Sequence, residues 1–394
     1  MRHVIWYTGY DLIVDDIVRA ENCSLFDSAG REYLDFESGV WCTSIGHSNP
    51  RVLAAIAEQS ALIAHAGFCY SSEVVEEAAL EILEVLDFEG GSCVFLCSGS
   101  EAVEYGVRVA QALSDRPLLM IMKDSYCGAY GSASRKRPEE WFSFDWTACD
   151  ECTRPGECTD QCDRWSGIPW DRIGGFLLEP GSSSGFVRFP PKKLVQAIAG
   201  KLAESGGFFL VNEVTTGVGR TGEWFGYRHY GVRPDIVGMG KGIGNGYPVS
   251  VTAFAPRVAE RLRETPLGYA QSHQNDPLGA AVVKAVVGFI RDEDLVARVR
   301  AVADRLQNGL EEIKARTGRI ADIRGRGLLI AVDLADERDA PAFAANVHRE
   351  MARRGFIFAR RPGTNTVRLD PPLTIRPEQV ARFLEAFEGV LGEE

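Results

Sequence analysis

Three apolar stretches between residues 174 and 250 each end in a residue type that often carries chemistry. Residues 174–178 precede Glu179, residues 208–211 precede Asn212, and residues 236–239 lie just before Lys241. Short apolar runs bounded by Gly and Pro predict strands that are buried on both faces, as in parallel sheets. Residues 192–205 have apolar positions at helical spacing, so the first two runs predict a strand–helix–strand unit.

In open α/β sheets, ligands bind beyond the carboxyl ends of the strands, so Glu179, Asn212 and Lys241 are expected to converge on one crevice. Lys241 stands among glycines, which allow the backbone to approach a bulky ligand closely. A lysine that is desolvated in such a pocket has a lowered pKa and can act as a nucleophile that forms a Schiff base. The alternative is a solvated lysine in a flexible surface loop.

The sequence around Lys241 favours the first interpretation, a lysine that forms a Schiff base. It reads Asn212-Glu-Val-Thr-Thr-Gly-Val-Gly-Arg-Thr-Gly222 and then Pro234-Asp-Ile-Val-Gly-Met-Gly-Lys241-Gly. This resembles the signature of the class III, pyridoxal-phosphate-dependent aminotransferases of fold type I. By that resemblance, Lys241 holds pyridoxal 5′-phosphate as a Schiff base and carries the proton between substrate and cofactor carbons.

The resemblance also implies an α/β fold with two domains. A large domain with a mostly parallel sheet sandwiched by helices is expected at residues 46–285, with a Cys-rich insert at 149–162. Residues 1–45 are expected to join residues 286–394 in a smaller α/β domain. The family forms homodimers with active sites at the subunit interface.

Composition excludes several other classes of protein. Of the 394 residues, 45% are hydrophobic, which is enough for a large core. The formal net charge of −12 argues against a nucleic-acid or anionic-membrane partner. No run of about 18 apolar residues appears, and the N-terminus lacks the apolar core of a signal peptide. We therefore expect a cytoplasmic protein.

A predicted strand at residues 93–97 runs into Ser98-Gly99-Ser100 and the start of a helix. Small residues at a helix N-terminus present free backbone N–H groups at the positive end of the helix dipole, which favours an anion. The cofactor phosphate is the expected anion. Ser98 and Glu101 are also correctly spaced for a capping box, and both functions can hold together.

The resemblance assigns further contacts. Tyr126 is expected to stack on the cofactor ring, Thr215 to bond its phenolic oxygen, and Ser272 to reach the phosphate of the partner subunit. Arg368 precedes a Pro-Pro turn and is expected to clamp the α-carboxylate of the substrate. The full set of expected cofactor contacts is Ser98, Gly99, Ser100, Tyr126, Glu179, Asn212, Val214, Thr215, Lys241 and Ser272.

Two departures from the family pattern bear on the reaction. Asn212 stands where the family has an Asp that keeps the pyridine nitrogen protonated, and an amide carries no charge. A second Glu, five positions after Glu179 in relatives that switch between an ω-amine and glutamate, is replaced by Ser184. Together with Thr215 in place of the usual Gln, this makes an ornithine or acetylornithine substrate less favoured than another amine or amino acid.

The Cys-rich segment at residues 149–162 has no large apolar residue and cannot order itself by burial. Its four cysteines, Cys149, Cys152, Cys158 and Cys162, could bind zinc or an iron–sulfur cluster. Their spacing matches no standard metal motif. Free thiols and disulfides are the alternatives.

The sequence thus predicts an aminotransferase that moves an amino group between an amine or amino acid and a 2-oxo acid. The second hypothesis, favoured by Asn212, is an isomerase on the same scaffold, either an amino acid racemase or an aminomutase. The third is a weakly catalytic protein whose cysteines hold a metal or sense redox state.

Overall fold

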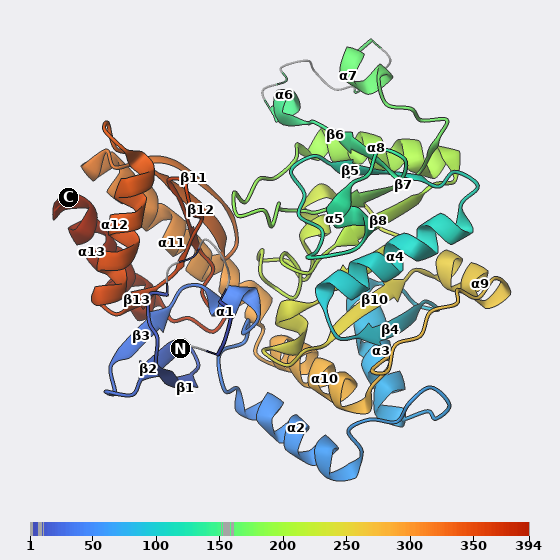
Figure 1. Ribbon diagram of the computed structural model, residues 1–394, viewed down its shortest axis with the longest axis horizontal. Coiled ribbons are helices and arrows are strands. Elements are labelled where there is room, and N and C mark those ends of the chain that lie inside the picture. Colours follow the sequence, from blue (N-terminus) through green and yellow to red (C-terminus); the bar gives the residue numbers. More distant parts are fainter. Residues whose placement is uncertain are drawn as a thin grey trace.

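The structure is a computed structural model that describes residues 3–6, 10, 12–150, 152, 158 and 161–393. A seven-stranded sheet lies at the centre of its larger part (Figure 1). The strand order is β4 (Ser92–Leu96), β10 (Ser250–Phe254), β9 (Ile236–Met239), β8 (Phe208–Asn212), β7 (Ile173–Leu178), β5 (Leu118–Met122) and β6 (Trp141–Phe144). All pairs from β9 to β6 are parallel, and β10 is antiparallel to both neighbours. The predicted mostly parallel sheet is confirmed.

Helices cover both faces of this sheet. Strand β5 shows why, because Leu119 points into a cluster with α4 (Gly99–Leu113) and the next residue, Met120, into a second cluster with α8 (Lys192–Ser205) and α10 (Pro277–Asp292). Successive residues of a strand point to opposite faces, so β5 needs apolar residues throughout. Helices α2 (Pro50–Leu62) and α3 (Glu73–Leu86) pack against α10, and α9 (Pro256–Glu264) packs against α4.

Two smaller sheets lie beside the large one. The first has the order β1 (Ile17–Glu21), β2 (Ser24–Asp27), β3 (Glu32–Asp35) and β13 (Phe356–Ile357). The second has the order β11 (Ile320–Arg326), β12 (Leu329–Leu334), β15 (Thr366–Leu369) and β14 (Ala359–Arg360), with α11 (Leu295–Thr317), α12 (Ala340–Arg353) and α13 (Pro377–Glu393) around it.

Strand β13 pairs in parallel with β3, which joins the two ends of the chain in one sheet. Figure 1 accordingly shows the blue N-terminal strands beside the red C-terminal helices. The predicted grouping of residues 1–45 with residues 286–394 in one domain stays a prediction. The predicted division at residue 285 falls inside α10. No helix of the described part of the chain is long and apolar enough to cross a membrane.

The remaining elements are single turns that connect the strands and helices. They are α1 (Ser38–Trp41), α5 (Ser132–Arg135), α6 (Thr147–Asp150), α7 (Asp163–Ser166), η1 (Gly226–Tyr230) and η2 (Lys241–Gly244). The turn α1 is left-handed, because Ser38, Gly39, Val40 and Trp41 have φ values of 51°, 53°, 59° and 64°. A left-handed conformation costs roughly 1–2 kcal/mol per non-glycine residue.

Tight packing inside β7 gives a stability prediction. A Cβ atom at Gly174 would lie 1.7 Å from the Arg116 backbone oxygen, so Gly174→Ala must displace backbone. We expect it to lower the free energy of unfolding by about 3 kcal/mol. The matched control is Gly200→Ala in the middle of α8, where a Cβ meets nothing within 4 Å. This control should raise stability by about 0.5–1 kcal/mol. Urea denaturation of both variants measures the contrast, and equal stabilities would contradict the packing described.

Candidate active site

A cavity of about 1450 Å³ opens at the carboxyl ends of the central strands. Its wall is formed by the N-terminus of α4, the segments after β5, β8 and β9, the left-handed turn α1, and residues 357–362 of the smaller part. This is the position at which open parallel sheets bind their ligands.

Glu179, Asn212 and Lys241 lie close together at the strand ends, but only two of them line the cavity. Asn212 and Lys241 line the cavity directly. Glu179 lies behind Asn212, is 3% exposed, and accepts a hydrogen bond from Asn212 Nδ2 at 2.9 Å. Glu179 was predicted as a cofactor contact; it does not line the cavity and instead orders the residues that do.

Lys241 is held at the bottom of the cavity. Its Nζ donates a hydrogen bond to Thr215 Oγ1 at 3.1 Å and lies 4.4 Å from the centre of the Trp41 ring. Burial lowers the pKa of Lys241 to about 8, and the nearby Cys42 and Glu179 oppose this shift. The backbone at Lys241 is left-handed, with φ at 48°. A lysine in this setting is a nucleophile near neutral pH.

The lowered pKa predicts how fast the protein without cofactor captures an added aldehyde such as pyridoxal phosphate. Only the neutral amine attacks a carbonyl carbon, so the capture rate should rise with pH and level off above about 8, the pKa of Lys241. Stopped-flow absorbance measures this rate. A peptide with a solvated lysine is the control, and its rate should keep rising to about pH 10. A protein profile that follows the peptide would contradict the desolvated setting.

The N-terminus of α4 faces the cavity at the predicted phosphate site. Ser98 is the N-cap, and its capping box with Glu101 is complete. Gly99 and Ser100 line the cavity and begin the helix, where backbone N–H groups have no carbonyl one turn earlier to bond. Ser100 Oγ accepts a hydrogen bond from Ala129 N at 2.9 Å, which leaves its proton to donate. The predicted capping function of Ser98 is confirmed.

The donor set of the cavity fits pyridoxal phosphate. Free amides at a helix N-terminus suit a phosphate, and Lys241 suits an aldehyde. A Cβ at Gly99 would lie 2.6 Å from Val214 Cγ1, so only a glycine lets the N-terminus of α4 pack against Val214 in the cavity wall. Tyr126, Val214 and Thr215 line the same cavity, and their contacts with the cofactor stay a prediction.

Arg368 lines the cavity on the side of the smaller sheet, on β15. Its side chain is 11% exposed, its Nε lies 3.4 Å from Asp370 Oδ2, and its guanidinium lies 3.8 Å from the centre of the Trp41 ring. Burial raises the pKa of Asp370, while the charges of Arg368 and Arg220 oppose this. Arg368 is thus a cation fixed by an aromatic face and a buried carboxylate, and its remaining donors can bind an anion.

Sequence reasoning missed three residues around Arg368. They are Trp41, Asp370 and Glu37, which lines the cavity and whose pKa burial raises to about 7 while Arg368 opposes the rise. Asp370 sits two residues after Arg368 on an extended segment, so strand periodicity could have suggested that both side chains face the same way. No sequence signal marks the left-handed turn that brings Trp41 under both cations.

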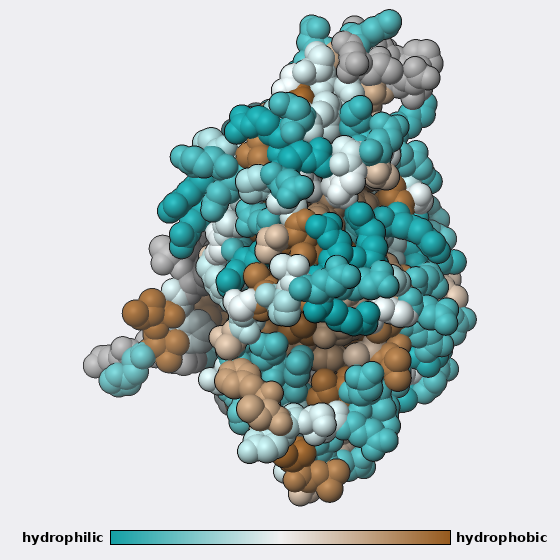
Figure 2. All heavy atoms as spheres, turned by 90° about the vertical axis from the view of Figure 1, so that its right-hand side faces the viewer, coloured by the Kyte–Doolittle hydropathy of each residue, from teal (hydrophilic) through white to brown (hydrophobic). Residues whose placement is uncertain are grey.

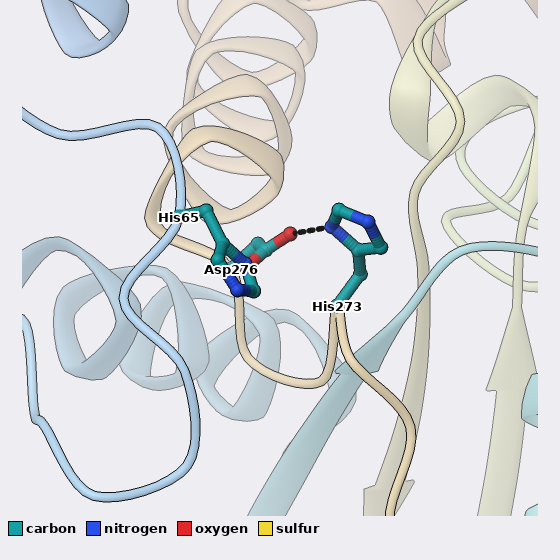
Figure 3. A group of neighbouring side chains, drawn as sticks. All are labelled: His65, His273 and Asp276. Atoms are coloured by element: carbon teal, nitrogen blue, oxygen red, sulfur yellow. Dashed lines mark hydrogen bonds and ion pairs between the residues drawn. The ribbon is translucent and has the colours of Figure 1, made fainter.

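Ser272 is exposed and does not line the cavity of its own chain. The next residue, His273, bonds Asp276 Oδ2 through Nδ1 at 2.5 Å, and His65 bonds Asp276 Oδ1 at the same distance (Figure 3). Among the described residues this is the one group of three possible metal ligands within 4.8 Å of one another. Because both imidazoles already bond the carboxylate, we interpret the group as a link between the two loops.

The four predicted metal ligands Cys149, Cys152, Cys158 and Cys162 are all free thiols. Burial raises the pKa of Cys149, and the other three thiols add to the rise. Cys149, Cys158 and Cys162 pack against the main core, and Cys152 is exposed. Within the described part of this segment no three sulfur atoms come within 4.8 Å of one another. The metal site therefore stays a prediction.

Comparison with known proteins agrees with this geometry. Residues 7–134 and 157–391 match the family described as Aminotransferase class-III. A 5-aminovalerate aminotransferase of Pseudomonas aeruginosa is 30% identical over 93% of this chain and 91% of its own length. A leucine/methionine racemase of Thermococcus litoralis is 29% identical over 95% and 90%.

Solved structures share the fold. An S-selective transaminase from Arthrobacter sp. with alanine bound superposes with a TM-score of 0.89 at 21% identity, covering 100% of this chain and 96% of its own. An acetylornithine aminotransferase from Elizabethkingia anophelis superposes with a TM-score of 0.84 at 24% identity, covering 98% and 96%.

Proposed function

Because this chain belongs to the class III, pyridoxal-phosphate-dependent aminotransferases of fold type I, we propose that Lys241 is the residue that binds the cofactor and moves the proton. The observation that carries this proposal is the lysine itself, desolvated at the end of β9 in a cavity that is also lined by the N-terminus of α4. Pyridoxal phosphate, when bound, supplies an aldehyde for the substrate amine and a ring that accepts electrons.

Other residues of the cavity are proposed to bind the cofactor, and Lys241 to transfer the proton. The amides of Gly99 and Ser100 hold the phosphate, with the hydroxyl of Ser100 as a further donor. Thr215 Oγ1 accepts a hydrogen bond from Lys241, and its own proton would be donated to the phenolic oxygen of the cofactor. The pKa of Lys241 is about 8, so part of the amine is neutral near neutral pH. The neutral amine can take a proton from the substrate carbon.

The substrates are an amine or amino acid and a 2-oxo acid, and Arg368 binds their carboxylate. Two relatives are named as aminotransferases of 5-aminovalerate and of acetylornithine, compounds that carry an ω-amino group. In this chain Ser184 replaces the second Glu of relatives that switch between an ω-amine and glutamate, and it lines the cavity. We therefore propose an amine or amino acid other than ornithine or acetylornithine.

We propose that the protein is active as a homodimer, in which Ser272 of one subunit binds the cofactor phosphate in the partner subunit. Its exposure, and its place outside the cavity of its own chain, support this assignment. Sedimentation of the holoenzyme tests the dimer. A Ser272→Ala variant that remains dimeric should bind the cofactor more weakly.

Incubation with an amino donor in the absence of a 2-oxo acid tests the transfer itself. Stoichiometric conversion of bound pyridoxal phosphate to pyridoxamine phosphate, followed by absorbance across a panel of amines and amino acids, is the expected result and also identifies the substrate. No conversion with any member of a broad panel would contradict the proposal.

The second candidate is a racemase or aminomutase, favoured by the uncharged Asn212 that lines the cavity and by the similarity to a leucine/methionine racemase. Solvent deuterium separates the two reactions. Label that enters recovered amino acid without accumulation of pyridoxamine phosphate indicates isomerisation.

The third candidate, a metal-holding or redox-sensing function of the Cys-rich segment, is supported by the presence of four free thiols in one short segment. Zinc or an iron–sulfur cluster would have to draw the sulfur atoms together. Metal analysis of protein purified without oxygen tests it, and a metal-free protein with full activity would exclude it.

A further inference from the structure

His65, His273 and Asp276 bring two imidazoles and a carboxylate together at the surface of the protein (Figure 3). Nδ1 of His65 lies 2.5 Å from Asp276 Oδ1, and Nδ1 of His273 lies 2.5 Å from Asp276 Oδ2. One nitrogen or oxygen atom from each residue lies within 4.8 Å of the other two. None of the three residues lines the cavity of the candidate active site, so the chemistry of Lys241 does not use them.

The backbone positions these side chains independently of their contacts with one another. Asn275 N donates to Phe95 O at 2.9 Å, and Asn275 Oδ1 accepts from Phe95 N at 2.9 Å, which fastens the segment before α10 to β4. Leu278 N, near the start of α10, donates to Ala64 O at 3.3 Å and so holds the segment of His65 beside α10. The donor atoms are therefore placed before any ion binds, which lowers the entropy cost of binding.

The three donor atoms are of the types that zinc binds in proteins. Imidazole nitrogen and carboxylate oxygen are both zinc ligands, and a site with three protein ligands takes water in its fourth position. The side chains of His65 and His273 are 46% and 60% exposed, so water reaches the group and both rings have room to turn. Within the described part of the chain, Asp276 forms no ion pair with a lysine or arginine. Its charge therefore faces no fixed cation that would compete with a metal ion.

A small movement of the two rings separates this arrangement from a zinc site. The donor atoms around tetrahedral zinc lie about 3.3 Å apart, because bonds from zinc to nitrogen and oxygen are about 2.0–2.1 Å long. Each ring nitrogen would move roughly 1 Å further from the carboxylate. Each neutral imidazole would bind the ion through Nδ1 and carry its hydrogen on Nε2. The ion would take the place of the hydrogens that now lie between the rings and the carboxylate.

We propose that His65, His273 and Asp276 form a structural site for one zinc ion, which joins the segment after α2 to the segment before α10. The site is separate from the Cys-rich segment, because its donors are nitrogen and oxygen. It does not depend on the proposed function. Ser272 directly precedes His273, so a bound ion also holds this exposed residue in place.

The experiment counts bound zinc and measures its bond lengths in the purified holoenzyme. Each protein is dialysed to equilibrium against zinc that is buffered by a chelator, and elemental analysis gives the number of ions per chain and their affinity. The X-ray absorption spectrum of the same samples gives the bond lengths, about 2.0–2.1 Å to nitrogen and oxygen and about 2.3 Å to sulfur. Neither readout depends on turnover.

The variants remove one ligand at a time. They are His65→Gln, His273→Gln and Asp276→Asn, together with the double variant that carries both histidine changes. Asp276 is the N-cap of α10, and asparagine is an equally good N-cap, so Asp276→Asn removes the charge without the cap. His3→Gln is the matched control, because it removes an exposed histidine near the N-terminus.

We expect the wild type and His3→Gln to bind one more zinc ion per chain than the double variant. The ion that the double variant loses should have nitrogen and oxygen neighbours at about 2.0–2.1 Å. Each single variant should weaken the binding of that ion by at least about 100-fold, since losing even a residue that supports a ligand costs 10–100-fold.

Equal zinc content and affinity in the wild type and the double variant would overturn the proposal. A wild-type spectrum with sulfur neighbours alone would also overturn it, because that zinc belongs to the Cys-rich segment. The wild-type spectrum decides without any substitution, so the test holds even if a variant fails to fold.

Discussion

Lys241→Ala is expected to lower kcat by roughly 10⁴-fold, because it removes both the group that binds the cofactor and the group that moves the proton. Lys241 Nζ lies 3.1 Å from Thr215 Oγ1 and 4.4 Å from the centre of the Trp41 ring, and no second lysine lines the described cavity. Single-turnover absorbance with an amino donor measures the loss. Added methylamine, which fits the space left by the side chain, should restore part of the rate.

Lys123→Ala is the matched control, since this lysine is 67% exposed and pairs with Asp145 outside the cavity. It should retain nearly full activity. A Lys241→Ala protein that turned over within about tenfold of the wild type would remove Lys241 from the chemistry. Mass analysis after borohydride reduction gives an independent readout: the cofactor should be attached at Lys241 in the wild type and the control.

Arg368→Gln is expected to lower kcat/KM for an α-amino acid by about 100-fold and to leave an amine without a carboxylate nearly unchanged. The physical reason is the loss of a cation that the structure holds in place through Trp41 and Asp370. The ratio of the two kcat/KM values is the measurement, because damage to the fold lowers both alike.

The buried Asp370 requires a companion variant. Arg368→Gln removes a cation that neighbours this fully buried carboxylate. Breaking a buried ion pair in this way costs about 3–5 kcal/mol of folding stability. Arg368→Gln with Asp370→Asn removes both charges and should regain much of that stability while keeping the changed substrate ratio. Arg382→Gln on the exposed side of α13 is the surface control. An unchanged ratio in the double variant would refute the assignment of Arg368.

The sequence predicted the central sheet well, because its strands are buried on both faces and must be apolar throughout. Helix α8 lies at the predicted residues, and the strand ends bring Asn212 and Lys241 together as the parallel arrangement requires. Those features depend on burial and periodicity, which are local properties of the chain.

The parts that depend on distant contacts could not be predicted. Glu179 stands at a strand end like Lys241, yet five hydrogen bonds turn it away from the cavity. Trp41 reaches the site through a left-handed turn that residue types do not indicate. The link of His65 and His273 to Asp276 joins segments some 200 residues apart and has no motif.

The pairing of β13 with β3 has a consequence for how the protein is made. Leu34 and Phe356 are direct partners, so the first sheet of the chain lacks its fourth strand until about 320 further residues have left the ribosome. At roughly 5–20 residues per second, this leaves β3 with an open edge for about 16–60 s. Unpaired strand edges promote association between chains. A nascent-chain holdase that covers this edge is therefore expected to raise the yield of correctly assembled enzyme.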